Sequence, residues 1–257
     1  MLDTLSELLP RLPGILGALT LVGLAIGISY WQKVGLEKSM AVAVVRAFIQ
    51  LIAIGYALQL IFDSDNPLWI AVIVGVMLTV AGLTSGKRAE SIPRARTIAF
   101  LSISTSLALT LGTLLAFKVF DPTPQSIIPI AGMIIGNAMT ATSLSMARIR
   151  DDLKSSRSAI ESALALGAPS RVAAQGQLRT ALATGMTPLV DSTKTVGLIA
   201  LPGAMTGMIL AGSPPMEAVQ LQIVVMFMLV GAAAFASMIA TFLTYHQFFT
   251  KAHQLKL

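Results

Sequence analysis

The chain has 257 residues, of which 55% are hydrophobic and only 12% are charged, with a formal net charge of +6. A soluble domain typically carries about 25% charged residues, so this composition and a mean hydropathy of +0.79 exclude an ordinary soluble protein. The absence of cysteine excludes disulfides and thiolate metal sites. The basic residues lie in short stretches between apolar runs, which indicates membrane orientation and not nucleic-acid binding.

Long uncharged runs predict an all-α fold, a polytopic bundle of about seven transmembrane helices, because roughly 20 apolar residues cross the hydrocarbon. The expected spans are 13–32, 40–62, 66–85, 98–120, 127–147, 187–212 and 217–245. The first has no small-residue cleavage site after it and is expected to be retained. Most of the 18 basic residues then fall on one side of the membrane, which predicts an outside N-terminus and a cytoplasmic C-terminus.

Polar turn clusters at 63–67, 121–124 and 213–215 predict short connections between neighbouring spans. We therefore expect a single transmembrane domain over 1–257, with one sizeable segment outside the membrane at about 148–187.

The span at 40–62 contains Arg46. A charged side chain in a span costs about 3 kcal/mol, so it needs a partner, a cavity or an interface. Arg46 and Gln50 are four residues apart and share one helical face. Either the two face a translocation path, or Arg46 snorkels to the cytoplasmic interface.

Asn137 lies near the middle of the span at 127–147. Two interpretations stay open: an interhelical hydrogen bond that holds the bundle together, and a polar position on a translocation path. Gly132 and Gly136, spaced as Gly-x-x-x-Gly, are expected to let a neighbouring helix approach closely.

The segment at about 148–187 is polar and basic, and the orientation places it in the cytoplasm. Residues 158–183 predict two short helices, because Gly167 and Pro169 end the first and Ser170 can cap the second.

The stretch 161–168, Glu-Ser-Ala-Leu-Ala-Leu-Gly-Ala, resembles the EAA loop of ABC-transporter permeases, whose short helix inserts into a groove of the ATPase subunit. This resemblance assigns ATPase coupling to Glu161, Ala163 and Gly167. The alternative for this stretch is an ordinary amphipathic linker.

The sixth span carries Asp191 and Lys194, which are three residues apart and can pair. They lie on a translocation path, or they form an ion pair that fixes the depth of the span. Pro202 and Gly203 weaken this helix, and Gly203 with Gly207 offers a further close contact, so the span is expected to flex.

The chain contains 13 methionines, and thioethers bind Cu(I) in preference to iron. Methionine also fills gaps in helical bundles without any ligand role. His246 and His253 lie at the cytoplasmic end, too far from the expected path for a transmembrane metal site. The metal ligands therefore stay unknown.

Three further stretches, 46–51, 130–139 and 191–203, resemble signatures of the FetB (YbbM-like) family of ABC-transporter permeases, and the similarity runs over nearly the whole chain. Members of that family are implicated in bacterial iron export, and plant relatives in aluminium tolerance. The resemblance implies a multi-pass permease subunit of the inner (plasma) membrane that exports iron or another metal and pairs with a separate ATPase.

The chain is not expected to be an enzyme or to bind a cofactor of its own, because 82–88 lacks P-loop spacing and no other nucleotide site is evident. ATP is expected on the partner subunit. We also expect a homodimer, since about seven spans are few for a transporter. The alternative is an ion-gradient-driven secondary transporter that uses Arg46, Asp191 and Lys194 as coupling groups and needs no ATPase.

Overall fold

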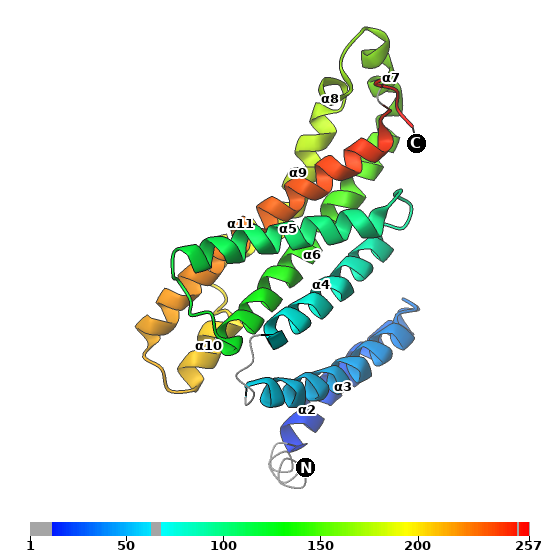
Figure 1. The fold of residues 1–257 in the computed structure, drawn as a ribbon. Coiled ribbons are helices and arrows are strands. Elements are labelled where there is room, and N and C mark those ends of the chain that lie inside the picture. The colour runs from blue at the N-terminus through cyan, green and yellow to red at the C-terminus, as the bar shows by residue number, and fades with distance from the viewer. Residues whose placement is uncertain (1–11, 63–67, 251, 257) are drawn as a thin grey trace. The chain divides into compact units, whose positions relative to one another are not determined.

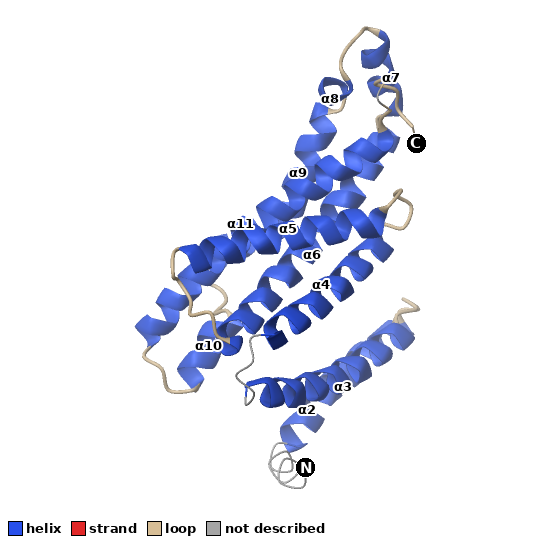
Figure 2. Ribbon diagram, in the orientation of Figure 1, coloured by secondary structure: helices blue, strands red, loops and turns tan. Residues whose placement is uncertain are grey.

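The computed structural model of the chain describes residues 12–62, 68–250 and 252–256. Throughout this part the regular structure is helical, with no β-strand, which confirms the predicted all-α class (Figure 2). The helices are α2 (Leu12–Trp31), α3 (Glu37–Phe62), α4 (Leu68–Arg88), α5 (Ala95–Ala116), α6 (Pro124–Ser155), α7 (Arg157–Ala165), α8 (Ser170–Ala173), α9 (Gln175–Thr195), α10 (Gly203–Leu210) and α11 (Pro215–Phe248).

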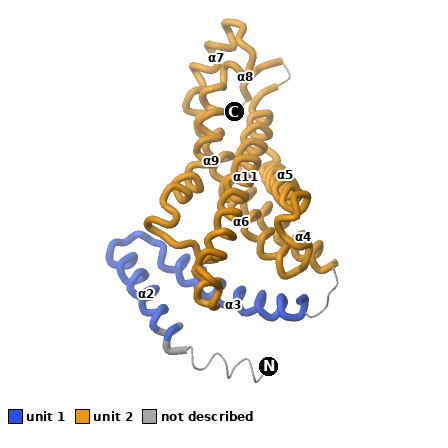
Figure 3. The backbone as a smooth tube through the Cα atoms, turned by 90° about the vertical axis from the view of Figure 1, so that its left-hand side faces the viewer, with its two compact units in different colours: residues 1–65 blue, residues 66–257 orange. Residues whose placement is uncertain are grey.

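The chain divides into two compact units, residues 1–65 and 66–257, which Figure 3 shows in different colours. In the first unit α2 contacts α3 across a short connection. Gly35 turns this connection with a φ of +79, and the Ser29 hydroxyl donates to Glu37 Oε1 over 2.8 Å. The predicted turn at 63–67 lies outside the described residues.

In the second unit α6 is the central helix and packs against α4, α5, α9 and α11. Figure 1 shows α7, α8 and the C-terminal end together at one end of this unit, and α10 at the opposite end. We call the first of these the elbow end, and we call residues 157–173 the elbow. One apolar core fills the middle of the bundle around Ile134 and Ala232, and a second at the elbow end contains Ile149, Ile160 and Leu178.

Five helices, α3, α4, α5, α6 and α11, are long and apolar enough to cross a membrane. They correspond to the predicted spans two to five and seven. At the first predicted span, 13–32, the structure has α2, whose apolar part Gly17–Trp31 is shorter than these five helices.

The helix of the fifth predicted span, 127–147, continues well past its predicted end. α6 has 32 residues, so at about 1.5 Å per residue it is roughly 48 Å long, against about 30 Å of hydrocarbon. Its last turns carry the ion pair between Arg148 Nε and Asp152 Oδ2, 2.9 Å apart, which supports the helix at i and i+4. This charged end of α6 therefore extends beyond the membrane at the elbow end.

The sixth predicted span, 187–212, is not one helix. α9 ends at Thr195 and α10 begins at Gly203. Between them Gly197, with a φ of +79, donates its backbone N–H to the Ala200 carbonyl over 3.0 Å, which turns the chain. The prediction of a continuous helix is wrong here because a hydropathy average does not register the turn, although α10 starts at the predicted weak point.

Glycines on α4 bring α5 close. A Cβ on Gly86 would lie 2.6 Å from Arg96 Cα, and one on Gly82 would lie 3.1 Å from Phe100 Cβ. Glycines spaced four apart permit such backbone approach between membrane helices. The close Gly-x-x-x-Gly contact therefore occurs on α4.

Buried hydroxyl groups also lie between the helices of the second unit. The Ser106 hydroxyl on α5 donates to the Ala232 carbonyl on α11 over 2.7 Å, and the Ser143 hydroxyl on α6 donates to Ser85 Oγ on α4 over 2.9 Å. Small polar residues suit close packing within a membrane bundle, so these contacts help to fix how α4, α5, α6 and α11 meet.

Candidate functional site

A small hollow with polar walls lies among α6, α9 and α11, with a volume of about 150 Å³. Its polar lining residues are Asn137 and Thr140 from α6 and Ser192 from α9. The rest of its wall consists of small or apolar residues, namely Ala141, Gly185, Pro188, Leu189 and Ala233. Two helices that are separate in the sequence, α6 and α9, thus bring oxygen and nitrogen atoms to one place, while α11 contributes Ala233 to the wall. Asn137 is partly buried, and Thr140 and Ser192 are exposed, so the hollow is open to the surface of the unit.

The Asn137 side chain hydrogen-bonds within its own helix. Its amide Nδ2 donates to the Met133 carbonyl over 2.9 Å, and the described residues offer it no bond to another helix. The interpretation of Asn137 as an interhelical bond is therefore not supported. The amide lines the hollow, where its oxygen can accept a hydrogen bond or contact a cation.

Thr140 lies almost one turn beyond Asn137 and also bonds its own helix, with its hydroxyl donating to the Gly136 carbonyl over 3.2 Å. Its oxygen keeps acceptor capacity toward the hollow. Ser192 faces the same space from α9. Thr140 and Ser192 could not be predicted from the sequence, because isolated hydroxyl residues are common on helices and only the fold brings these two together.

Asp191 and Lys194 do pair, with Lys194 Nζ 3.0 Å from Asp191 Oδ1. Both side chains are exposed, at 60% and 69%, and neither lines the hollow. Ser192, between them in sequence, is the residue of this stretch that faces the hollow. The structure thus separates the charged pair from the polar hollow on the same helix.

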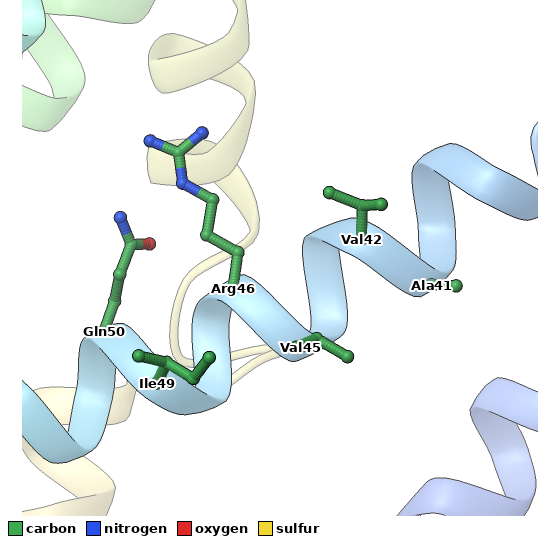
Figure 4. A pocket seen from close by; sticks show the side chains of 6 residues that line it. All are labelled: Ala41, Val42, Val45, Arg46, Ile49 and Gln50. Atoms are coloured by element: carbon green, nitrogen blue, oxygen red, sulfur yellow. The ribbon is translucent and has the colours of Figure 1, made fainter.

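Arg46 and Gln50 extend from the same side of α3, as their spacing predicts (Figure 4). Both line a surface hollow of about 440 Å³ whose other lining residues, Ala41, Val42, Val45 and Ile49, also belong to this helix. Within the described residues no ion pair joins Arg46 to a carboxylate. Arg46 therefore presents a guanidinium beside an amide within an otherwise apolar stretch, 40–55, of this helix.

The glycines predicted to pack helices make few close contacts in the described chain. A Cβ on Gly132 would lie 3.8 Å from Met77 Cε, an ordinary contact, whereas Gly136, Gly203 and Gly207 have no atom within 4 Å of that position. Gly203 instead begins α10, directly after its N-cap residue Pro202.

Gly185 was not predicted from the sequence, although it makes the closest contact at the hollow. Added to Gly185, a Cβ would collide with the hydroxyls of Ser145 on α6 and Ser237 on α11. Only glycine lets α9 approach both helices here. No sequence pattern marked it, because no second glycine stands four residues away.

Methionine in this region belongs to the core. Met133 and Met139 are partly buried and pack against the apolar cluster in the middle of the bundle, as gap-filling residues do. Among the described residues no group of three or more His, Asp or Glu side chains could hold a metal ion.

The first helix of the elbow, α7, ends at the predicted break, and α8 begins at Ser170 as predicted. The second helix differs from the prediction, because α8 ends at Ala173 and residues 175–183 form the start of α9, which continues to Thr195. Gly167 has a φ of +89, its N–H donates to the Leu164 carbonyl over 2.9 Å, and the Ala168 N–H donates to the Ala163 carbonyl over 3.1 Å. These two bonds form a Schellman motif, which ends a helix and favours glycine at the left-handed position. Gly167 thus has a clear local role in ending α7.

The elbow is fixed on one side and open on the other. Ile160 is buried against the elbow-end core, while Glu161 is exposed and pairs with Arg157, with Nε and Oε1 2.8 Å apart. Ala163 is half-buried. Leu166 is 90% exposed at the end of α7, and hydropathy alone would have placed this residue inside. Ile160 thus fixes α7 to the bundle, while Leu166 extends outward at the end of this helix.

Comparison with known proteins fits this architecture. The family model described as "Uncharacterised protein family (UPF0014)" matches residues 13–249, almost the whole chain. The chain belongs to the UPF0014 family. All five membrane-length helices lie within the matched residues, and the chain is a membrane protein.

Several relatives in this family are similar over most of their length. The chain is 49% identical to the Protein ALUMINUM SENSITIVE 3 of Arabidopsis thaliana, over 93% of this chain and 88% of that protein. It is 48% identical to the UPF0014 membrane protein STAR2 of Oryza sativa subsp. japonica, over 93% and 84%. It is 39% identical to the Probable iron export permease protein FetB of Escherichia coli K12, over 93% and 92%. The resemblance to the FetB family is confirmed. No solved structure matches the chain.

Proposed function

We propose that this UPF0014 protein is the permease subunit of an ABC transporter in the inner (plasma) membrane. It works as a homodimer and exports iron or another metal. A separate ATPase binds at the elbow and hydrolyses ATP. The chain supplies the path and the coupling surface, and no catalytic residue.

The position and packing of the elbow are the main support for this proposal. It lies at the end of the unit where the charged last turns of α6 extend past the membrane. Its buried residue Ile160 fixes α7 to the core that also holds α9 and α11, so force applied to α7 reaches these helices. The exposed Leu166 and the small residues of the EAA-like stretch are available to a groove on a partner.

The interrupted sixth segment supports the homodimer. In the turn between α9 and α10, Leu198 and Ile199 are 87% and 82% exposed. Non-helical backbone is tolerated at membrane depth only where protein or a water-filled path covers it. A second copy packed over this turn would provide such cover.

The polar hollow supports a transport role for the bundle. Its amide and hydroxyl oxygens are ligands that hard metal ions accept, and it adjoins α9, the helix that precedes the turn in the sixth segment. The assignment to iron rests on the relative named as a probable iron export permease, and the relative named for aluminium sensitivity extends the class to other metals.

Co-purification of the chain with an ATPase subunit from the same cells tests the proposal. Leu166→Ser is expected to reduce recovery of the ATPase about tenfold, as loss of a buried apolar anchor does. The matched control is Leu210→Ser, which changes an 83% exposed leucine at the end of α10, at the opposite end of the unit. It should leave recovery unchanged. If no ATPase binds the wild-type chain, the proposal fails.

A further inference from the structure

The elbow end contains a second hollow, of about 490 Å³, distinct from the hollow among α6, α9 and α11. It lies where the start of α8 meets the end of α11 and the residues that follow it. Eight residues line it, namely Ser170, Arg171, Phe242, Tyr245, His246, Phe249, Thr250 and His253. No transport step proposed above uses it.

The wall of this hollow is built by the fold of the last residues. After α11 the chain turns back, with the Lys256 N–H donating to the Phe248 carbonyl over 2.8 Å and the Thr250 N–H to the Gln254 carbonyl over 2.9 Å. His253 adopts a left-handed backbone with a φ of +56, which non-glycine residues rarely adopt. Such conformations persist where surrounding contacts impose them.

Ser170 provides those contacts. Its hydroxyl lies 2.6 Å from the Tyr245 hydroxyl and 2.8 Å from His253 Nδ1, and its backbone N–H donates to the same nitrogen over 3.3 Å. Because Nδ1 accepts the backbone N–H, the neutral ring carries its hydrogen on Nε2. His253 is therefore held in place through one nitrogen and keeps the other as a donor.

The lining of this hollow supplies hydrogen-bond donors and one permanent cation, the Arg171 guanidinium. It contains no carboxylate. Arg171 has no ion pair among the described residues, and its guanidinium lies 5.4 Å from the centre of the Phe242 ring. The His246 ring makes no side-chain hydrogen bond in the described chain and lies 5.1 Å from the Tyr245 ring, centre to centre. The guanidinium disfavours a metal cation in the hollow, whereas arginine with imidazole and hydroxyl donors is the chemistry that binds phosphate.

We propose that this hollow binds a phosphate-type anion, either free or as the head group of a phospholipid. The Arg171 guanidinium, the His246 ring and the Thr250 hydroxyl supply hydrogen bonds to its oxygens. Phe242 and Phe249 offer an apolar wall to an ester group. The bound anion holds the elbow, through Arg171, against the turned-back residues that carry His253.

Calorimetric titration of the purified full chain, in a maltoside detergent at constant ionic strength, tests this site. One arm uses inorganic phosphate and the other a short-chain phosphatidic acid. Saturable binding of inorganic phosphate supports the site and assigns it a soluble ligand. Saturable binding of phosphatidic acid alone supports the site and assigns it a lipid. If neither ligand saturates, the proposal is overturned.

Substitutions in the lining test whether the anion binds in this hollow. Arg171→Gln and His246→Gln should each weaken binding about tenfold or more, since each removes a hydrogen bond to a charged ligand. Arg179→Gln, an exposed basic residue on α9 outside the lining, should change it by less than about twofold. Equal losses for Arg171→Gln and Arg179→Gln would overturn the proposal, because they would indicate attraction by overall charge. Saturable Zn²⁺ binding that is lost in His246→Gln, without phosphate binding, would overturn it as well.

Discussion

Gly185 lies where α9 crosses α6 and α11, with the Ser145 and Ser237 hydroxyls at the place that a side chain would occupy. Gly185→Ala should lower the free energy of unfolding by about 1–3 kcal/mol, as overpacking of a tight contact does. Thermal unfolding of the purified protein measures the change. Gly136→Ala is the control, because no atom lies within 4 Å of its Cβ position, and it should leave the midpoint unchanged or raise it slightly through the higher helix propensity of alanine.

Removing both hydroxyls provides a sharper test of the same contact. Ser145→Ala with Ser237→Ala should restore much of the stability that Gly185→Ala loses. A Gly185→Ala protein as stable as the wild type would show that α9 does not approach the other helices as described.

Asn137 allows the hollow to be tested without disturbing the packing. Its only hydrogen bond in the described chain stays within α6, so Asn137→Ala should leave the thermal midpoint nearly unchanged. If the hollow lies on the path, metal export by cells should fall about tenfold, as for loss of one hydrogen bond to a charged ligand. Ser192→Ala should act in the same direction. Full export in both variants would remove the hollow from the path.

Individual site residues could be predicted from the sequence where their own chemistry is unusual. Residues whose role depends on the packing of neighbouring helices could not. Asn137 was predicted because an amide is costly in a span, and it lines the hollow. Gly185 and Ser192 could not be predicted, because their importance depends on the crossing of α6, α9 and α11. The Gly132 and Gly136 pattern predicted a close contact, but spacing does not tell which glycines face a neighbouring helix.

Among the secondary-structure elements, the end of the first elbow helix was predicted at the right place, because Gly167 and Pro169 end a helix through their own backbone preferences. Gly167→Ala should destabilise the end of α7 by about 1–2 kcal/mol, since an L-residue is strained at a φ of +89. Limited trypsin digestion of inside-out vesicles should then cleave the elbow faster. Asn tolerates this backbone better, so Gly167→Asn should be cleaved at an intermediate rate. Unchanged cleavage in Gly167→Ala would contradict the Schellman assignment.

The differences between the predicted spans and the observed helices have local physical causes. Hydropathy placed the end of the fifth span at 147, where charges begin, and the helix continues past that point with the support of the Arg148–Asp152 pair. The sixth run is apolar throughout its second half, yet Gly197 and Pro202 interrupt it. Hydropathy reports the environment of a segment and does not report whether its backbone is continuous.

For the whole molecule, the absence of cysteine makes the orientation directly measurable. Ser158→Cys places one exposed thiol on α7, and Met216→Cys places one near the start of α11, where the native side chain is 68% exposed. A membrane-impermeant maleimide added to intact cells should label only Met216→Cys. In inside-out vesicles it should label only Ser158→Cys. The reverse pattern would place the elbow outside and exclude an ATPase partner there.

ATP-dependent metal movement in proteoliposomes tests the central claim most directly. Vesicles are prepared with the chain alone, with the chain and its ATPase, and with an ATPase variant that binds ATP without hydrolysing it. We predict iron movement only when the chain, the active ATPase and ATP are together. Iron movement by the chain alone, driven by an ion gradient in vesicles without ATP, would contradict the proposal and favour a secondary transporter.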